Sequence, residues 1–217
     1  MREMILAAAV VLACSPVRAA DEPSADAKEV KTLIATAVGS TIDVLKDKNN
    51  DKDARRKKVY ALIDPVVDWP LMGKLTLGRE HWPQFDEPQR KEFLESFSRV
   101  IRDSVYDKVQ VYTNETVDFD DATPADKGKY ALLMHVFSQG QKFKALFKLH
   151  REQDGAWKVY DLEIEGISMV KIYSAQYDQF LAKGTPDQLL EKLKAKALAV
   201  PDQFKVVARP KKVDAKQ

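Results

Sequence analysis

Three segments in the second half of the chain decide its fold class: YALLMHVF (130–137), QKFKALFKLH (141–150) and WKVYDLEI (157–164). In the middle segment apolar residues alternate with lysines, which is typical of a β-strand with one buried face and one solvated face. The apolar residues are Phe143, Ala145, Phe147 and Leu149, and the lysines are Lys142, Lys144 and Lys148. Short turn sequences containing Gly140 and Gly155 join the segments. They predict an antiparallel meander whose apolar face needs a cover.

Amphipathic helices on both sides of these strands supply that cover. Apolar residues between Asp26 and Leu45 recur with the i, i+3, i+4, i+7 spacing of a single helix face. Further helices are predicted over 53–63, from about 68, from about 86 to 106, over 168–183 and from 185 onward. A short strand is predicted at 115–119 and a polar loop at 120–129. The chain is therefore expected to have an α+β fold with helices packed on one face of the meander.

The length and charge of the chain restrict the classes of protein it can belong to. With 217 residues, 45% of them hydrophobic, it is long enough for one sizeable core. Lys and Arg (35) nearly balance Asp and Glu (33), which argues against a surface built to bind nucleic acid. A single cysteine excludes a disulfide framework and a cysteine-rich zinc scaffold.

The N-terminal segment has the pattern of a secretory signal. An apolar run from Ile5 to Cys14 is followed by Val17-Arg18-Ala19, which offers small residues for cleavage. We therefore expect residues 1–19 to be a signal peptide, residues 20–200 to form the folded domain, and the basic tail 201–217 to be disordered. The less favoured alternative is a lipoprotein signal, in which Cys14 would carry the lipid.

No sequence motif indicates catalysis or a cofactor. Asp47, Asn49 and Asp51 resemble the start of a calcium-binding loop, but the glycine and the glutamate that such a loop needs are missing.

Ser168 and Lys171 match the S-x-x-K pattern of serine acyl enzymes without its companion motifs, and a serine at a helix start usually caps the helix. The histidines share no metal-ligand spacing; they are His81, His135 and His150. We expect no enzyme activity, no metal and no cofactor.

Large apolar and aromatic residues converge on the sheet and on at least two helices. Either they fill a solid core, or they line a pocket for a hydrophobic ligand. The pattern alone leaves both interpretations open.

Two stretches resemble the MlaC family. LGREHW (77–82), followed by Phe93, Phe97 and Tyr106, is similar to the family's L-G-R-x-W…F-x-x-x-F…Y pattern. WKVYDLEIEGISMV (157–170) is similar to its W-K-V-Y-D-x-x-x-E-G-V-S-L-V signature. Members are periplasmic phospholipid-binding components of toluene-tolerance ABC transport systems in Gram-negative bacteria. The chain departs from the pattern at Ser174, at Glu87-Pro88 and at Tyr177.

The resemblance implies a fold, a ligand and partners. It implies a curved antiparallel sheet whose concave face is covered by several helices, with an apolar cavity between the layers that holds the acyl chains of a phospholipid. The residues expected to line this cavity are Tyr106, Met134, Phe143, Phe147, Tyr160, Ile164, Ile167, Val170 and Tyr173. The hydroxyls of Tyr160 and Tyr173 are expected near the glycerol region at the mouth, and the headgroup near solvent.

As a periplasmic carrier, the protein would pass lipid between an inner-membrane ABC transporter complex and an outer-membrane lipoprotein complex, and so contribute to outer-membrane lipid asymmetry. A monomer with transient membrane contact is expected, and Lys142, Lys144 and Lys148 are candidates for docking an acidic partner or an anionic membrane. The alternatives are a carrier for another hydrophobic lipid, as in the branch associated with hopanoids, an exported cone-shaped α+β enzyme, or an adaptor with a solid core. The direction of transport and the headgroup preference are not encoded in any motif.

Overall fold

The structure is a computed structural model that describes residues 22–47, 49, 51–110, 115–138, 140–196 and 198. The expected signal segment (1–19), Cys14 and the basic tail (201–217) lie outside the described residues. The helices are α1 (Ala25–Lys46), α2 (Lys52–Ile63), α3 (Trp69–His81), α4 (Glu87–Val109), α5 (Met169–Leu181) and α6 (Pro186–Lys194), with short 3-10 turns at Trp82–Gln84 and Asp126–Gly128. The strands are β1 (Thr116–Phe119), β2 (Thr123–Ala125), β3 (Lys129–Ser138), β4 (Gln141–Arg151), β5 (Trp157–Ile164) and β6 (Ile167–Ser168).

The strands form one antiparallel sheet in the order β1-β3-β4-β5-β6, and β2 pairs with the first part of β3. This arrangement confirms the predicted α+β fold and its central meander. The loop predicted at 120–129 is wrong in part, because Thr123–Ala125 adds a short strand to the edge of β3. Three residues that contain Pro124 are too few to show an alternating pattern, and they pair only at a sheet edge, where proline is tolerated.

Capping residues set the helix ends. Asp68, Asp86 and Thr185 each accept a hydrogen bond from a backbone N–H in the first turn of α3, α4 and α6. The first helix begins one residue before the predicted Asp26, because Ser24 is its cap. The side chains of Gln89 and Gln188 reach back to the cap residues of α4 and α6 and complete two capping boxes.

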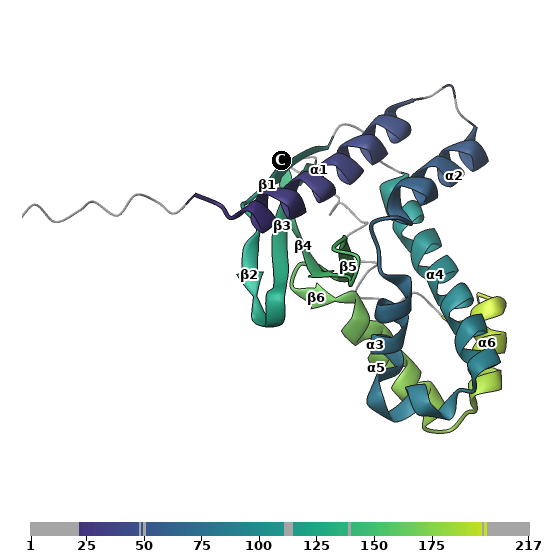
Figure 1. The fold of residues 1–217 in the computed structure, drawn as a ribbon. Coiled ribbons are helices and arrows are strands. Elements are labelled where there is room, and N and C mark those ends of the chain that lie inside the picture. Colours follow the sequence, from purple (N-terminus) through teal and green to yellow (C-terminus); the bar gives the residue numbers. More distant parts are fainter. Residues whose placement is uncertain are drawn as a thin grey trace, which may run out of the picture.

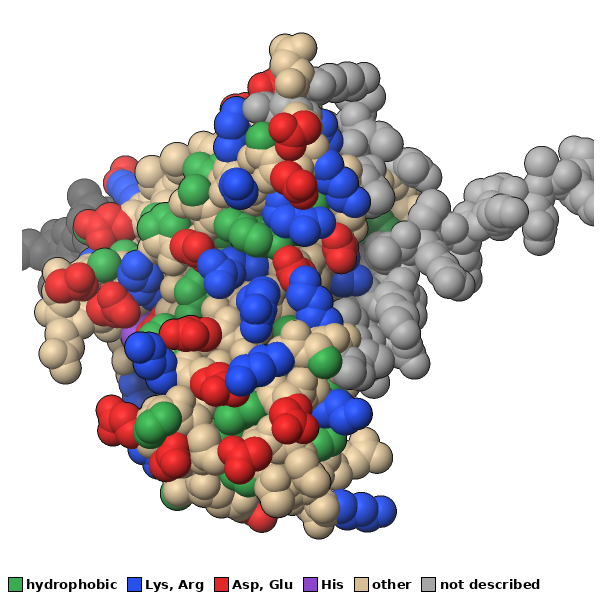
Figure 2. Space-filling view, turned by 90° about the vertical axis from the view of Figure 1, so that its right-hand side faces the viewer, with side chains coloured by type: hydrophobic (Ala, Val, Ile, Leu, Met, Phe, Trp, Pro, Cys, Tyr) green, Lys and Arg blue, Asp and Glu red, His purple; other side chains and the backbone are tan. Residues whose placement is uncertain are grey.

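The helices lie on one side of the sheet and extend below it (Figure 1). Helix α1 crosses the sheet near β1 and β3, and α2 returns beside it toward α4 (Figure 1). The segment before α3 joins the sheet directly, since Val66 and Asp68 exchange backbone hydrogen bonds of 2.9 Å with Val159 of β5. Seen over α2, α4 and α6, the surface carries interspersed acidic and basic side chains, as expected for the outward side of a helical layer (Figure 2).

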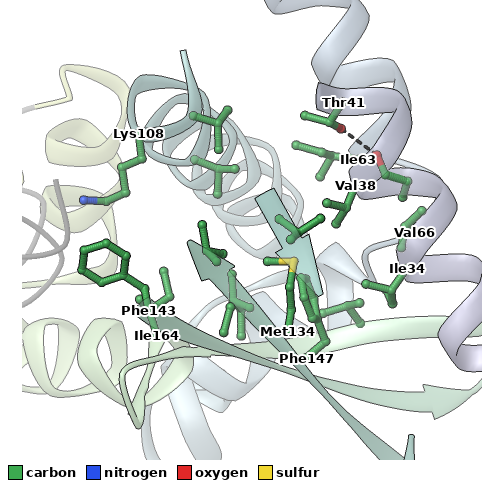
Figure 3. A pocket seen from close by; sticks show the side chains of 18 of the residues that line it. Ile34, Val38, Thr41, Ile63, Val66, Lys108, Met134, Phe143, Phe147 and Ile164 are labelled. Carbon is green, nitrogen blue, oxygen red and sulfur yellow. Dashed lines mark hydrogen bonds between the residues drawn. The ribbon is translucent and has the colours of Figure 1, made fainter. Parts of the chain in front are cut away.

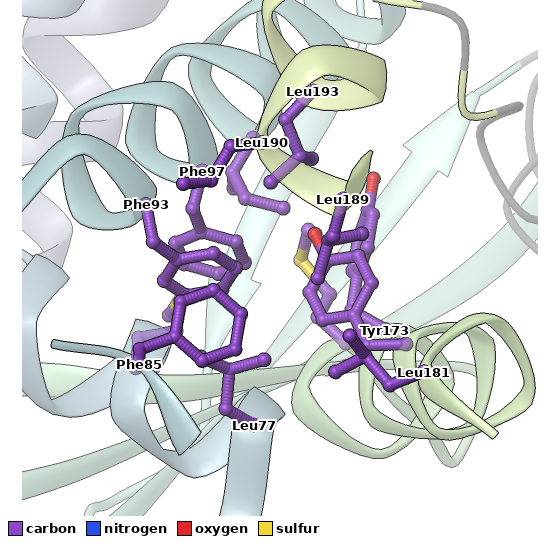
Figure 4. Close-up of a cluster of buried hydrophobic side chains, with 13 residues drawn as sticks. Leu77, Phe85, Phe93, Phe97, Tyr173, Leu181, Leu189, Leu190 and Leu193 are labelled. Carbon is purple, nitrogen blue, oxygen red and sulfur yellow. The ribbon is translucent and has the colours of Figure 1, made fainter. Parts of the chain in front are cut away.

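A tightly packed apolar cluster holds α3, α4, α5 and α6 together (Figure 4). The rings of Phe93 and Phe97 stack at 5.7 Å, and Tyr177 meets the ring of Phe93 edge-on at the same distance. Gly73 of α3 allows this approach, because a β-carbon there would lie 2.6 Å from a methyl carbon of Leu94. This part of the molecule is a solid core.

Gly78 explains the L-G-R motif of α3. Its backbone angles, φ 63° and ψ −168°, interrupt the helix between Leu77 and Arg79. Only glycine occupies this region of backbone space without strain. The kink leaves Leu77 fully buried in the cluster and lets the chain continue into the turn at Trp82.

Candidate functional site

A cavity of about 600 Å³ lies between the apolar face of the sheet and the helices α1 and α4 (Figure 3). Its helical wall consists of Ile34, Ala37, Val38, Thr41, Ile42 and Leu45 of α1 and of Ile101, Val105, Lys108 and Val109 of α4. Its sheet wall consists of Val117, Met134, Val136, Phe143, Ala145, Phe147, Val159, Leu162 and Ile164. The end of α2, the segment after it and the first turn of α3 close it with Ile63, Val66, Val67, Trp69 and Met72.

The cavity exists because α1 packs on the sheet along only part of its length. In the N-terminal half, Ala27, Val30 and Ile34 are buried in an apolar cluster with Leu132 and Leu149 of the sheet. Farther along, the apolar positions of the same face are only half-buried; they are Ala37, Val38 and Ile42. These apolar side chains point inward but remain half-buried, which means that few protein atoms pack against them. The space beside them is therefore unfilled.

The register of the strands explains the composition of the sheet wall. Val136 pairs with Phe143, Met134 with Ala145, and Ala145 in turn with Ile164. Residues that are direct partners across neighbouring strands project from the same face of the sheet. The alternation of apolar residues in the sequence therefore becomes one continuous apolar wall.

Four of the nine residues expected to line the cavity do so, and all four lie on the strands: Met134, Phe143, Phe147 and Ile164. Tyr160 does not, because the register shifts between β4 and β5. Lys148 pairs with Asp161 and Leu149 with Val159, so Tyr160 is left over as a bulge residue. Its ring lies 5.9 Å from that of His150 and 4.3 Å from Lys129 Nζ, away from the cavity lining.

Of the other four expected residues, three lie in or beside packed clusters and one is exposed. Tyr106 is fully buried against Leu45 and Val59, and its hydroxyl donates to the carbonyl of Lys52 over 3.1 Å. Tyr173 and Val170 belong to the cluster of α3 to α6, and Ile167 is 37% exposed on β6. A helical aromatic residue can face a solid cluster or a cavity with the same spacing, so periodicity could not separate these cases. Neither tyrosine hydroxyl expected at the mouth lies among the lining groups.

The residues of α1 and the lysine of α4 were missed by the sequence analysis. The apolar face of α1 was visible as a pattern, but nothing in it distinguishes positions that pack from positions that border empty space. The sequence offered one signal for Lys108: it interrupts the apolar spacing of α4 near the end of that helix. Burial lowers the pKa of the Lys108 ammonium.

The groups that resembled catalytic motifs have structural partners outside the cavity. Ser168 accepts a hydrogen bond from the backbone N–H of Lys171 and caps α5, as the alternative interpretation of S-x-x-K predicted. The three histidines contact single carboxylates: His81 contacts Asp178, His135 contacts Asp120 and His150 contacts Asp68. Among the described residues, no group of three His, Cys, Asp or Glu side chains is placed to hold a metal ion.

The candidate docking lysines differ in their surroundings. Lys148 contacts the carboxylates of Asp161 (3.1 Å) and Glu163, so its ammonium is already paired within the fold. Lys142 and Lys144 are exposed, and the Lys142 ammonium lies 5.3 Å above the ring of Phe137. Among the described helices, none is long and apolar enough to cross a membrane.

The fold and the cavity define a class: an α+β protein that holds an apolar pocket between a meander and its covering helices. Comparison with family models gives the family. Residues 35–195 match the model described as MlaC protein, and the chain belongs to this family. A comparison with curated proteins gave no match.

A solved structure shares the fold. It is the phospholipid-binding protein from Ralstonia solanacearum, determined in complex with a phospholipid. The TM-score is 0.67 at 21% identity, and the match covers 83% of this chain and 99% of that one. At this identity the comparison supports the fold, and the function has to be argued from the cavity.

Proposed function

We propose that the protein binds a phospholipid with its acyl chains in the cavity and carries it between membranes. The observation that supports this most directly is the unfilled volume of about 600 Å³, walled by aliphatic and aromatic side chains from α1, α4 and the sheet. This size lies within the range of about 300–1,000 Å³ typical of small-molecule pockets. Membership of the MlaC family and the phospholipid seen in the Ralstonia protein support the same ligand.

The energetics favour a carrier that exchanges lipid at a membrane rather than through water. Each methylene moved from water to an apolar site contributes about 0.8 kcal/mol, so two tails of about fifteen methylenes each contribute about 24 kcal/mol. That exceeds the limit of about 18–21 kcal/mol for noncovalent affinities, and a lipid bound from water would not leave. In a bilayer the tails are already dry, so their transfer into a dry cavity is close to neutral.

The location and the partners belong to this proposal. The expected signal segment at residues 1–19 supports export to the periplasm. There the protein would take lipid from one membrane complex and deliver it to another, an inner-membrane ABC transporter complex and an outer-membrane lipoprotein complex, and so contribute to outer-membrane lipid asymmetry. The apolar side chains that make up most of the lining support a binding role rather than a catalytic one; its described charged residues are Lys108, Glu115 and Lys144.

Extraction of the purified protein tests the proposal. The mature chain is purified without detergent from a Gram-negative host, unfolded, and extracted with organic solvent for mass spectrometry. We expect phospholipid in a fixed stoichiometric ratio to protein. A protein free of lipid, or one that carries hopanoid lipid instead, would overturn the proposed ligand.

A further inference from the structure

Apart from Thr41 of α1, whose hydroxyl donates to the carbonyl of Ala37, the polar side chains that line the cavity lie at one end of it. They come from the last turn of α4, the start of β1 and the turn between β3 and β4. They are Lys108, Glu115, Ser138, Gln141 and Lys144. Lys108 lies beside Phe143, opposite Val38 and Ile34 of α1 (Figure 3). The cavity therefore has a polar end, defined here by these five residues.

The strand register brings three of these residues together. Ser138, the last residue of β3, pairs with Gln141 of β4. Its hydroxyl donates a hydrogen bond of 2.9 Å to the carboxylate of Glu115, which immediately precedes β1. A hydroxyl, an amide and a carboxylate thus lie side by side where β1, β3 and β4 meet.

The wall two turns earlier along α4 is apolar. Ile101 borders the cavity there and is buried in the same cluster as Met72 and Met169, which also line the cavity. A cavity with polar groups at one end and apolar groups at the other distinguishes the two ends of an amphipathic ligand.

Lys108 is the cation best placed to contact such a ligand. It is half-buried at the cavity wall, and this burial lowers the pKa of its ammonium. An anion beside the ammonium would offset that destabilisation, since opposite charges favour each other's ionised forms. An ammonium has three N–H donors, so it can bind a phosphate oxygen in addition to a protein partner.

Resting on the proposed function, we propose that the phospholipid binds in a single orientation, with its headgroup phosphodiester against Lys108 at the polar end and its tails toward Ile101 and Met72. Lys108 is then the residue that lets the cavity distinguish a phospholipid from an uncharged lipid with the same tails. Glu115, which also lines the polar end, disfavours a headgroup with a second negative charge.

A competition between two lipids with identical tails tests this orientation. The lipid-free protein is mixed with vesicles of phosphatidylcholine that contain equal amounts of phosphatidylglycerol and of the matching diacylglycerol, and the bound lipids are analysed after separation. We expect the wild type to bind the phospholipid in preference to diacylglycerol, and Lys108→Met to lose about tenfold of this preference, as for a hydrogen bond to a charged group. The matched control is Lys91→Met, at an exposed position near the other end of α4, which should behave as wild type.

The remaining outcomes separate the two proposals. If Lys108→Met binds lipid and keeps the full preference, the orientation is wrong and the carrier function stands. If the folded wild type binds neither lipid, the carrier function fails, and the orientation with it. Inorganic phosphate at millimolar concentration should not displace the phospholipid; displacement would assign Lys108 to a free-phosphate site and overturn the orientation. Thermal unfolding of both variants shows that each is folded, and Lys108→Arg should restore part of the preference.

Discussion

Ser168 donates a hydrogen bond of 2.7 Å to Asp161, and both side chains are buried where β5 meets the start of α5. Asp161 also accepts from the backbone N–H of Val170 (3.2 Å) and contacts the ammonium of Lys148 (3.1 Å). One carboxylate therefore joins the sheet to the first turn of a helix. These residues lie within the second stretch that resembles the family pattern, and their role in the structure is to fix this junction.

Replacing that carboxylate should destabilise the fold. In Asp161→Asn the amide oxygen can still accept a hydrogen bond, but the amide N–H groups face groups that are themselves donors to Asp161. The half-buried Lys148 also loses one of its two carboxylates. We expect the free energy of unfolding to fall by about 2–3 kcal/mol, as measured by urea denaturation. The exposed Asp43→Asn on α1 is the control and should change it by less than about 0.5 kcal/mol. An equal effect of the two variants would contradict a structural role for Asp161.

Local chemistry made much of the fold predictable. Side-chain caps such as Asp86 and Thr185 and alternating apolar residues act over a few positions, so they can be read from the sequence. The bulge at Tyr160 could not be read, because it depends on how β5 pairs with β4. A strand continued with regular alternation puts Tyr160, Leu162 and Ile164 on one face, and the single extra residue moves Tyr160 off that face.

Two glycines provide a test of backbone conformation. Gly78→Ala forces an alanine into φ 63° and ψ −168°, and we expect it to cost about 1–3 kcal/mol of stability. Gly39, within α1, has no atom within 4 Å of an added β-carbon. Gly39→Ala should therefore stabilise the protein by about 0.5–1 kcal/mol through helix propensity. Chemical denaturation of both variants measures the difference, and a stable Gly78→Ala protein would show that the kink is not required.

The same substitution in the solid cluster and in the cavity wall should have different effects. Phe97 is 1% exposed in the cluster of α3 to α6, whereas Phe143 is half-buried beside the cavity. We expect Phe97→Ala to lower the free energy of unfolding by about 3–5 kcal/mol. Phe143→Ala should lower it by less than half as much and should change which lipids are retained. Similar losses of stability would indicate that the space beside Phe143 is packed in solution.

The division between cluster and cavity also limits what the sequence could reveal about the site. On β3, β4 and the end of β5 the alternation predicted correct lining residues, because it assigns each residue to one face of the sheet; it failed at Tyr160, at the bulge, and at Ile167 of β6. The helix patterns predicted no correct lining residue, since an apolar helix face reads the same whether it meets side chains or an open volume. The gap under α1 depends on the distance between layers, which Ile34 and its neighbours set through tertiary packing.

Acid should weaken the contact between α2, α4 and the end of α6. The Asp103 carboxylate accepts hydrogen bonds from the hydroxyl of Tyr60 and the ammonium of Lys196. Burial acts to raise the pKa of Asp103, but the hydrogen bonds from Lys196 and Tyr60 hold it below its usual range. A carboxyl with a lowered folded pKa stabilises the protein above its unfolded pKa of about 3.9, and this contribution is lost as the pH falls through the folded value.

Asp103→Asn should therefore be less stable than the wild type at pH 7, and the difference should shrink below about pH 4. The effect is expected to be modest, because the group is partly solvated and screened. Urea midpoints at pH 7 and at pH 3 measure it for both proteins. A difference that does not depend on pH would assign the effect to lost packing instead of lost charge.

Filling part of the cavity should weaken lipid binding without unfolding the protein. Ala37 lies on the half-buried inner face of α1 and lines the cavity, while its neighbour Thr36 is exposed on the outer face. In Ala37→Trp the indole occupies apolar space that the tails would need, and we expect bound phospholipid to fall by about tenfold, equal to ~1.4 kcal/mol. Thr36→Trp adds the same side chain toward solvent and should retain lipid as the wild type does. Mass spectrometry of extracted lipid measures binding, and thermal unfolding should place both variants within about 1 kcal/mol of the wild type. If Ala37→Trp retained lipid fully, the ligand would have to lie elsewhere, and the cavity between α1 and the sheet would lose its assigned role.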